Sequence, residues 1–434
     1  MQSPSQRFHT QLFKFEHTLR TQWSLESPAT PEQLCNYEDN WLSSFQNKYL
    51  GATEQELMRV IAHSSCVIVS DFHPLKRSRQ DFSTIIELMN ISAPTIAVLE
   101  LLNSDVSIKS GSRYQDIKLE NGWPLHQSYP QLFDNDLQAK YDIVGAWIDG
   151  SPSERDAYAA SVAANLNESQ PNSKLAFHFG DWHLAKQHLP QELKQRDISA
   201  TAVHLSPSPL WDKVNKRDFD EVIRLSDSEW AWMRTPPLAH AAAFLLDFGA
   251  CDSEEYSEEL SFLIEIAATN LARSLDVEQP QSAFEVMQAD EWHNFYDSLD
   301  TESQQSFNAC PEYAVFHPRL ARMWIPSEVD ANQIIQGAAH LLYCQQYATG
   351  NAFIDAFRSA LLRNLCSITI NPFYKLPDNC YNSENQWVER GAFKLAKDIS
   401  CHEHTSIQNI LRSLKHVELR DYELQSLRDT IGVA

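Results

Sequence analysis

The sequence has little of several features that define common protein classes. Its 434 residues include only 11 glycines, which argues against a glycine-rich β architecture and leaves room for many helices. No apolar run is long enough to cross a bilayer, and the longest candidate, around Leu238–Phe248, is too short. No apolar stretch typical of a signal peptide and no lipobox cysteine lies near the start. We therefore expect a cytoplasmic protein without a membrane span.

Positive charge is also scarce. Lysine and arginine number 35 against 58 aspartates and glutamates, which gives a formal net charge of -23. A surface of this sign repels nucleic-acid phosphates and anionic lipids. We therefore expect no nonspecific binding to nucleic acid or to an anionic membrane.

The cysteines lack the spacing of a disulfide framework or a zinc site. There are eight, and none forms a Cys-x-x-Cys pair, so the sequence predicts reduced thiols. The run Cys401–His404 resembles a ligand cluster. Adjacent residues of a helix point to different sides, however, so we expect no metal site there.

The length exceeds one ordinary core and predicts more than one structural unit. Residues 1–60 are expected to form helices that pack on an α/β domain, with the capping-box pattern Thr53–Glu56 at the start of one helix. Residues 61–215 are expected to form that α/β domain. Residues 225–434 carry mainly helical patterns and predict an α-helical domain of unknown role.

Short runs rich in β-branched residues alternate with helical patterns in the central region. This alternation predicts an α/β fold, with a mostly parallel sheet covered by helices on both faces. The long connection before the third strand contains Trp123–His126 and is expected to form either a lid or a packed excursion. The predicted strands are 66–70, 95–99, 142–146, 174–179 and, more weakly, 200–204, and the predicted helices are 79–89, 153–166 and 183–196.

Polar residues follow three of these strands directly. In an open parallel sheet, ligands collect at the carboxyl ends of the strands, so these residues are expected to share one rim. Two of the turns, Ser70–His73 and Gly180–His183, share the pattern small residue, aspartate, aromatic residue, histidine. The predicted catalytic residues are His73, Glu100 and His183, and Asp71, Asp181 and His178 are predicted to be further ligands, orienting groups or contacts to a cofactor.

Two kinds of chemistry fit this rim. His73, Glu100 and His183 could hold a divalent metal ion and leave a position for a water molecule, whose pKa would fall. Without a metal, Glu100 and a histidine could act as an acid/base pair. The sequence has no Gly-x-Ser-x-Gly elbow, no P-loop and no dinucleotide fingerprint.

The same segments resemble the ChaN-like family, whose superfamily includes the Tiki-type proteases and the erythromycin esterases. The resemblance covers roughly residues 55 to 210. Ser70 stands where the family usually has glycine, and Asp71 stands where many members have glutamate. The segments that carry the resemblance are Val67–His73, Ala97–Glu100, Phe179–Ala185, His188–Pro190 and an Arg-Asp pair within Ser153–Ala160.

The resemblance implies three alternatives. The first is a hydrolase that acts on a small molecule or a peptide, either with a metal, as in Tiki-like relatives, or by His/Glu acid/base chemistry, as in erythromycin esterases. The second is a haem- or iron-binding protein without turnover, as ChaN-type proteins suggest. The third is an inactive scaffold whose helical half is an interaction surface. An all-α appendage on an α/β domain often packs across a dimer, so a homodimer is a further expectation.

Overall fold

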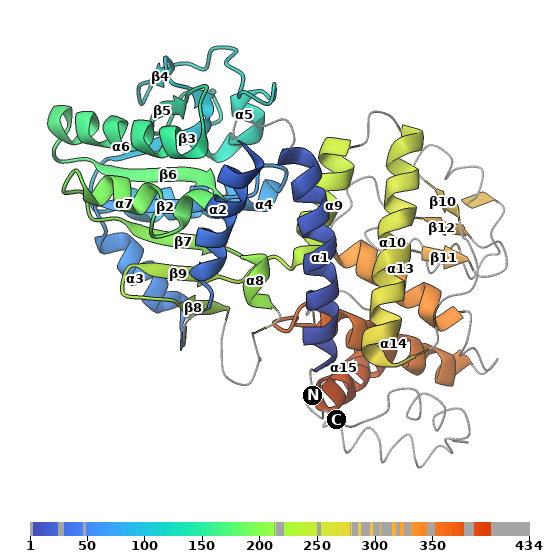
Figure 1. The fold of residues 1–434 in the computed structure, drawn as a ribbon. Coiled ribbons are helices and arrows are strands. Elements are labelled where there is room, and N and C mark those ends of the chain that lie inside the picture. Colours follow the sequence, from blue (N-terminus) through green and yellow to red (C-terminus); the bar gives the residue numbers. More distant parts are fainter. Residues whose placement is uncertain are drawn as a thin grey trace. The chain divides into compact units, whose positions relative to one another are not determined.

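A computed structural model gives the fold in two compact units, Glu16–Thr235 and Met1–Phe15 together with Pro236–Ala434 (Figure 1). We call the first the α/β unit and the second the helical unit, and describe each by itself. Helix α1 (Pro4–Ser24) runs through the boundary at residue 15. The structure describes residues 3–24, 30–46, 49–211, 213, 221–249, 253–277, 279, 285–287, 296–297, 304, 315–317, 322–324, 331–344, 352–376 and 386–400.

The α/β unit is built on a nine-stranded sheet in the order β1-β8-β9-β7-β2-β6-β3-β5-β4. Neighbours from β9 to β5 in this order pair in parallel, whereas β1, β8 and β4 add antiparallel pairs toward the edges. This confirms the predicted α/β class and its mostly parallel sheet. The strands are β1 (Leu50–Ala52), β2 (Cys66–Asp71), β3 (Thr95–Asn103), β4 (Ser107–Ile108), β5 (Asp142–Trp147), β6 (Lys174–Gly180), β7 (Thr201–Leu205), β8 (Val222–Arg224) and β9 (Glu229–Trp232).

The five predicted strands all occur, and four of them match within one residue at each end. The fifth, β3, continues to Asn103, past the end predicted at residue 99, and its register with β5 shifts between Leu99 and Asn103. Gly145 permits the close approach of the two strands, because a Cβ atom there would lie 1.9 Å from the Asn103 carbonyl oxygen. Strands β8 and β9, which we did not predict, extend the sheet beyond residue 215.

Helices cover both faces of this sheet. Thr53 and Ser151 each form a capping box, at the start of α3 and of α6, and the first was predicted. The prediction of one helix over residues 183–196 is wrong, because a 3₁₀ turn and a separate short helix occupy this segment. Pro190 lies in the first turn of the short helix, where proline is tolerated, and so the helix begins at Leu189. The helical segments are α2 (Pro31–Ser43), α3 (Glu54–His63), α4 (Lys76–Asn90), α5 (Leu125–Ser128), η1 (Pro130–Leu132), α6 (Pro152–Ser169), η2 (Asp181–Leu184), α7 (Leu189–Lys194) and α8 (Ser208–Trp211).

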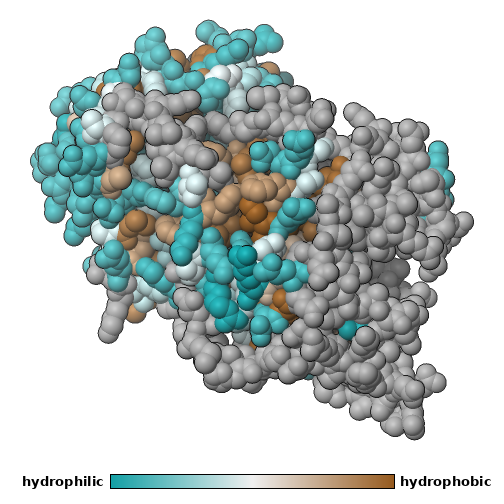
Figure 2. Space-filling view, turned by 45° about the vertical axis from the view of Figure 1, so that its right-hand side comes forward, coloured by the Kyte–Doolittle hydropathy of each residue, from teal (hydrophilic) through white to brown (hydrophobic). Residues whose placement is uncertain are grey.

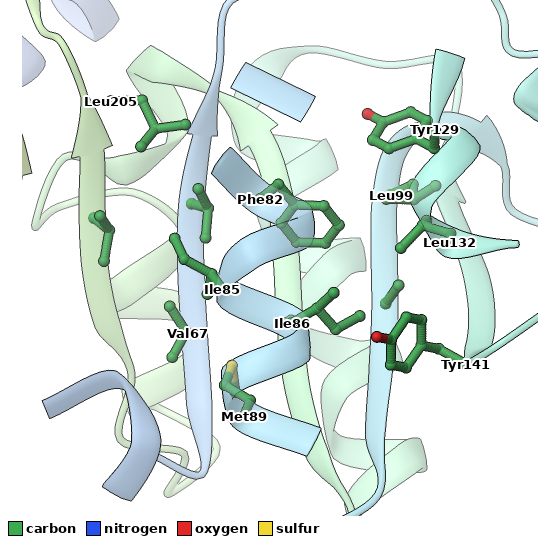
Figure 3. Close-up of a cluster of buried hydrophobic side chains, with 14 of the residues drawn as sticks. Val67, Phe82, Ile85, Ile86, Met89, Leu99, Tyr129, Leu132, Tyr141 and Leu205 are labelled. Atoms are coloured by element: carbon green, nitrogen blue, oxygen red, sulfur yellow. The ribbon is translucent and has the colours of Figure 1, made fainter. Parts of the chain in front are cut away.

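The two faces of the sheet have separate cores because alternate residues of a strand point to opposite sides. In β2, Val67 and Val69 join a core that includes α3 and α4, whereas Ile68 joins a core that includes α6 and α7. Figure 3 shows Phe82 and Ile86 of α4 among the side chains of the first core. The sheet is therefore anchored on both sides, which fixes where its strand ends lie.

The long connection between β4 and β5 packs into the first of these cores. Leu125, Tyr129, Leu132 and Phe133 are buried in it. Figure 3 shows Tyr129 and Leu132 beside Leu99 of β3. This segment is thus a packed excursion whose side chains reach the carboxyl end of the sheet.

The helical unit contains long helices and one small sheet of strand order β10-β12-β11. Its helices agree with the helical patterns of the sequence, but the small sheet was not predicted. The segment 401–404 lies outside the described residues. The elements are α9 (Pro237–Ala242), the π-helix η3 (Ala243–Gly249), α10 (Ser253–Leu275), β10 (Glu285–Met287), β11 (Val315–His317), β12 (Arg322–Trp324), α13 (Ala331–Cys344), α14 (Ala352–Ile370) and α15 (Gln386–Ser400).

The helices and the exposed side chains were compared with what a membrane span requires. Across the described ranges, no helix combines the length and the apolar character that a bilayer crossing requires. Figure 2 shows many hydrophilic side chains on the coloured part of the face it presents. The large hydrophobic side chains that are exposed in the described residues are Leu50, Ile91, Leu137 and Phe262.

Candidate functional site

The carboxyl ends of β2, β3 and β6 bring the three predicted catalytic residues together at Gly180. A Cβ atom on Gly180 would lie 3.4 Å from Glu100 Oε2, 3.7 Å from His183 Cδ2 and 3.8 Å from His73 Cε1. Gly180 ends β6, Glu100 lies in β3, and His73 follows β2 by two residues. Gly180 and His183 lie 80 or more positions after Glu100 and His73 in the sequence. They converge because parallel strands end at one edge of the sheet.

His73 is held by the aspartate of its own turn. Its Nδ1 lies 2.8 Å from Asp71 Oδ2, and Ser78 donates a hydrogen bond of 2.6 Å to Asp71 Oδ1. Burial lowers the pKa of His73, but the charges of Asp71 and Glu100 outweigh it and raise the pKa above 6.5. The His73 side chain is still 19% exposed, whereas that of Asp71 is 1% exposed. His73 is therefore a titratable imidazole at the border of the site.

His183 is held between two carboxylates. Its Nδ1 lies 2.7 Å from Asp156 Oδ1, and its Nε2 lies 3.1 Å from Glu100 Oε1. Burial lowers the pKa of His183, but Glu100 and Asp156 raise it to about 10. Burial raises the pKa of Glu100, but His183 and the Gly180 N–H, at 2.6 Å from Oε2, lower it to about 2. At neutral pH this group is an imidazolium that pairs with the ionised Glu100 carboxylate on one side and contacts Asp156 on the other.

Tyr37 of α2 completes the surroundings of His183. Its hydroxyl donates a hydrogen bond of 2.5 Å to Asp156 Oδ2 and lies 2.9 Å from His183 Nδ1. Its ring stacks on His188 with centroids 3.6 Å apart, and Asn40 Nδ2 lies 3.2 Å from His188 Nε2. Burial and Asp156 raise the pKa of Tyr37 well above 10, so the hydroxyl keeps its proton. An N-terminal helix therefore supplies part of the site.

His178 lies behind Asp71, away from solvent. Its side chain is 0% exposed, and its Nε2 lies 3.6 Å from Asp71 Oδ1. Its Nδ1 lies 2.8 Å from the Tyr129 hydroxyl, and its ring stacks on Phe82. Burial lowers the pKa of His178 to about 4, so this imidazole is neutral at neutral pH. His178 therefore packs against Asp71 on the side away from solvent.

Two arginines border the site, each against a tryptophan. The Arg79 guanidinium lies 4.6 Å from the Trp123 ring centroid, and one of its nitrogens donates a hydrogen bond to the His73 carbonyl. The Arg155 guanidinium lies 3.9 Å from the Trp147 ring centroid, with Nη1 3.7 Å from Glu100 Oε1. These cations offset part of the carboxylate charge.

The structure thus brings five of the six predicted residues into one network. The sixth, Asp181, is buried in the turn between Gly180 and His183. Residues that the sequence reasoning did not assign are Asp156, Tyr37, Tyr129 and Arg155. The Arg-Asp pair at 155–156 was noticed only as part of the family resemblance, and no pattern in the sequence marks Tyr37 or Tyr129.

The predicted metal site can be compared with this geometry. In the part of the chain that the structure describes, no group of three or more His, Cys, Asp or Glu residues is arranged to hold a metal ion. His183 uses both ring nitrogens with carboxylates, and a metal ligand would need one of them deprotonated and free. The donor set therefore fits a hydrogen-bonded network better than a ligand set. Metal and haem binding stay predictions.

Comparison with known proteins identified no relative. No protein-family model, no curated protein and no solved structure matches the chain. The function is therefore argued from the geometry of the site.

Proposed function

We propose that the α/β unit is a ChaN-like domain and that it hydrolyses a small molecule or a peptide by acid/base chemistry, in which His73 is the base and Glu100 orients the water. The helical unit would have another role. The observation that carries the proposal is the convergence of His73, Glu100 and His183 around Gly180. Three polar groups from three strands, all of them largely buried, are a costly arrangement for a purely structural purpose.

In the proposed reaction, a water molecule beside Gly180 donates a hydrogen bond to the Glu100 carboxylate. Because Asp71 engages Nδ1 of His73, the proton of this water would pass to Nε2 of the neutral imidazole. The water oxygen forms a bond to the substrate carbonyl carbon, and the bond from that carbon to the leaving group breaks. His73 then returns the proton to the leaving group.

His183 has a positioning role in this scheme. With a pKa of about 10 it stays protonated at neutral pH, and it fixes Glu100 through Nε2. Asp156 and Tyr37 fix the other edge of the ring. The pKa of Glu100, about 2, keeps this carboxylate ionised, so it is suited to orient water and is too weak a base to take its proton.

The test is Gly180→Ala in the full chain. The added methyl group would enter the space among the three side chains at ordinary contact distances, so the fold should tolerate it within about 1 kcal/mol. Hydrolysis of p-nitrophenyl acetate and of a fluorogenic peptide mixture should fall by roughly 100-fold, because the methyl group would displace the water and the substrate carbonyl group. Thr84→Ala on the exposed face of α4 is the control.

The same preparation separates the alternatives. Hydrolysis that Gly180→Ala and His73→Ala leave intact would contradict the proposal. No hydrolysis, together with a Soret band after haem addition, would replace it with haem binding. No hydrolysis, no haem and no bound metal by elemental analysis would leave the scaffold alternative. Hydrolysis that is lost on chelation and restored by a divalent ion would favour the metal-dependent form.

A further inference from the structure

Arg155 lies at the same sheet edge as the proposed site but belongs to none of its hydrogen-bond pairs. It lies in the first turn of α6 and its side chain is 16% exposed. The guanidinium carbon of Arg155 lies over the ring of Trp147, which ends β5, at 3.9 Å from the ring centroid. The tryptophan therefore holds this cation in place.

The donors of Arg155 are not used within the described residues. A guanidinium has five N–H donors, yet Arg155 forms no side-chain hydrogen bond there, and its Nε is buried without a partner. Its one ion-pair contact, from Nη1 to Glu100 Oε1, is 3.7 Å and exceeds hydrogen-bond length. A largely buried guanidinium with unused donors costs free energy unless an acceptor arrives.

The neighbouring carboxylates take their hydrogen bonds from other donors. Glu100 accepts from the Gly180 N–H and pairs with His183, and Asp156 accepts from Tyr37 and pairs with His183. Arg79 offers a contrast, because it donates a hydrogen bond to the His73 carbonyl and stacks on Trp123. Arg79 therefore has a structural acceptor, whereas Arg155 has donors ready for a ligand.

We propose that Arg155 binds an oxyanion of the substrate, a carboxylate or phosphate group beside the bond to be cleaved. Held against Trp147, the guanidinium has two parallel N–H groups that can match two oxygens of one such group. In a chain of net charge -23, this local cation also counters the repulsion that an anionic ligand meets. The inference rests on the proposed hydrolase function and adds the class of substrate.

The test compares two esters that share a leaving group, p-nitrophenyl acetate and mono-p-nitrophenyl succinate, which carries a carboxylate. The full chain should prefer the succinate in kcat/KM, and Arg155→Met should reduce the ratio of the two kcat/KM values by roughly 10- to 100-fold. Arg155→Lys should lower the ratio by less, because it keeps the charge and loses the paired N–H edge. Arg155→Lys also carries the test where Arg155→Met does not fold.

The matched control is Arg224→Met. Arg224 likewise lies over a tryptophan, Trp230 at 5.5 Å, and pairs with an acidic residue, Asp227, but it lies in β8. Arg224→Met should leave the ratio of the two kcat/KM values unchanged. An equal loss for both esters in the Arg155 variants, or an unchanged ratio, would overturn the proposal.

A binding experiment separates this proposal from the hydrolase function. Butyrate, butyramide and inorganic phosphate are titrated into the full chain and into Arg155→Met, with binding followed by ligand-observed NMR. Binding of butyrate or phosphate that is lost in Arg155→Met, without ester hydrolysis, would support the oxyanion site and refute the hydrolase. Hydrolysis without binding of butyrate or phosphate would support the hydrolase and refute the oxyanion site. The anion that binds more tightly shows whether the site takes a carboxylate or a phosphate group.

Discussion

The two histidine turns of the α/β unit share one residue pattern and differ in how their histidines are held. In Ser70–His73, the aspartate two residues before the histidine pairs with it at 2.8 Å. In Gly180–His183, the ring nitrogens pair with Asp156 of α6 and Glu100 of β3. The first pair is local to its turn, and the second joins three elements distant in sequence.

This difference gives the two imidazoles different electrostatic properties. His73 pairs with the aspartate of its own turn and its side chain is 19% exposed, whereas the His183 side chain is 8% exposed and pairs with Glu100 and Asp156. An imidazole in contact with solvent can exchange its proton. A buried cation between two anions keeps its proton and orients its neighbours. The same pattern therefore serves proton transfer in one turn and positioning in the other.

The largest expected effect is on stability. His183→Ala leaves the buried Glu100 and Asp156 without their shared cation and should cost roughly 3–5 kcal/mol. His73→Ala should cost about 1–2 kcal/mol, because Asp71 keeps the hydrogen bond from Ser78. Urea unfolding of the full chain measures both values. Equal losses would show that the two histidines are held alike.

The second expected effect is a loss of stability at alkaline pH. The folded pKa of His183 is about 10 and the ordinary value is 6.5, so the folded state binds this proton more tightly. The resulting stabilisation is complete below pH 6.5 and is lost as the pH rises toward 10, by up to a few kcal/mol. Unfolding of His183→Gln between pH 6.5 and 10 should be less dependent on pH than that of the wild type. Parallel curves would refute this.

The third expected effect is on the pH dependence of hydrolysis. The proposed base, His73, acts when neutral, so kcat/KM should rise with pH through a midpoint above 6.5. Asp71→Asn removes the carboxylate that raises this pKa and should move the midpoint to lower pH. Asp156→Asn, which alters the other turn, should leave the midpoint in place. A shift in Asp156→Asn alone would assign the base to His183.

The smallest expected effect concerns Tyr37. Tyr37→Phe keeps the ring on His188 and removes the hydrogen bond to Asp156, so it should cost about 1–2 kcal/mol. The kcat value should fall several-fold and KM should stay constant, because Tyr37 acts only through His183. Tyr49→Phe, whose hydroxyl donates to the Lys213 carbonyl at 3.2 Å, is the control and should change neither. A change in KM alone would place Tyr37 in contact with the substrate.

Much of the scaffold could be predicted because its signals are local. β-branched runs bounded by polar residues marked five of the six strands that pair in parallel, and the capping box at Thr53 marked the start of α3. Strands β8 and β9 escaped prediction because three or four residues show no clear periodicity. The error at 183–196 was avoidable, since Pro190 signals that a helix begins there and does not continue through it.

The sequence by itself determined which edge of the sheet carries the polar groups. Runs of β-branched residues mark the strands, and parallel pairing brings their carboxyl ends to one rim, so His73, Glu100 and His183 could be named in advance. Only the tertiary structure decided their partners. Asp156 and Tyr37 reach His183 from helices 27 and 146 residues away. Side-chain pairing at such separations depends on packing in three dimensions, for which a single sequence has no periodic signal.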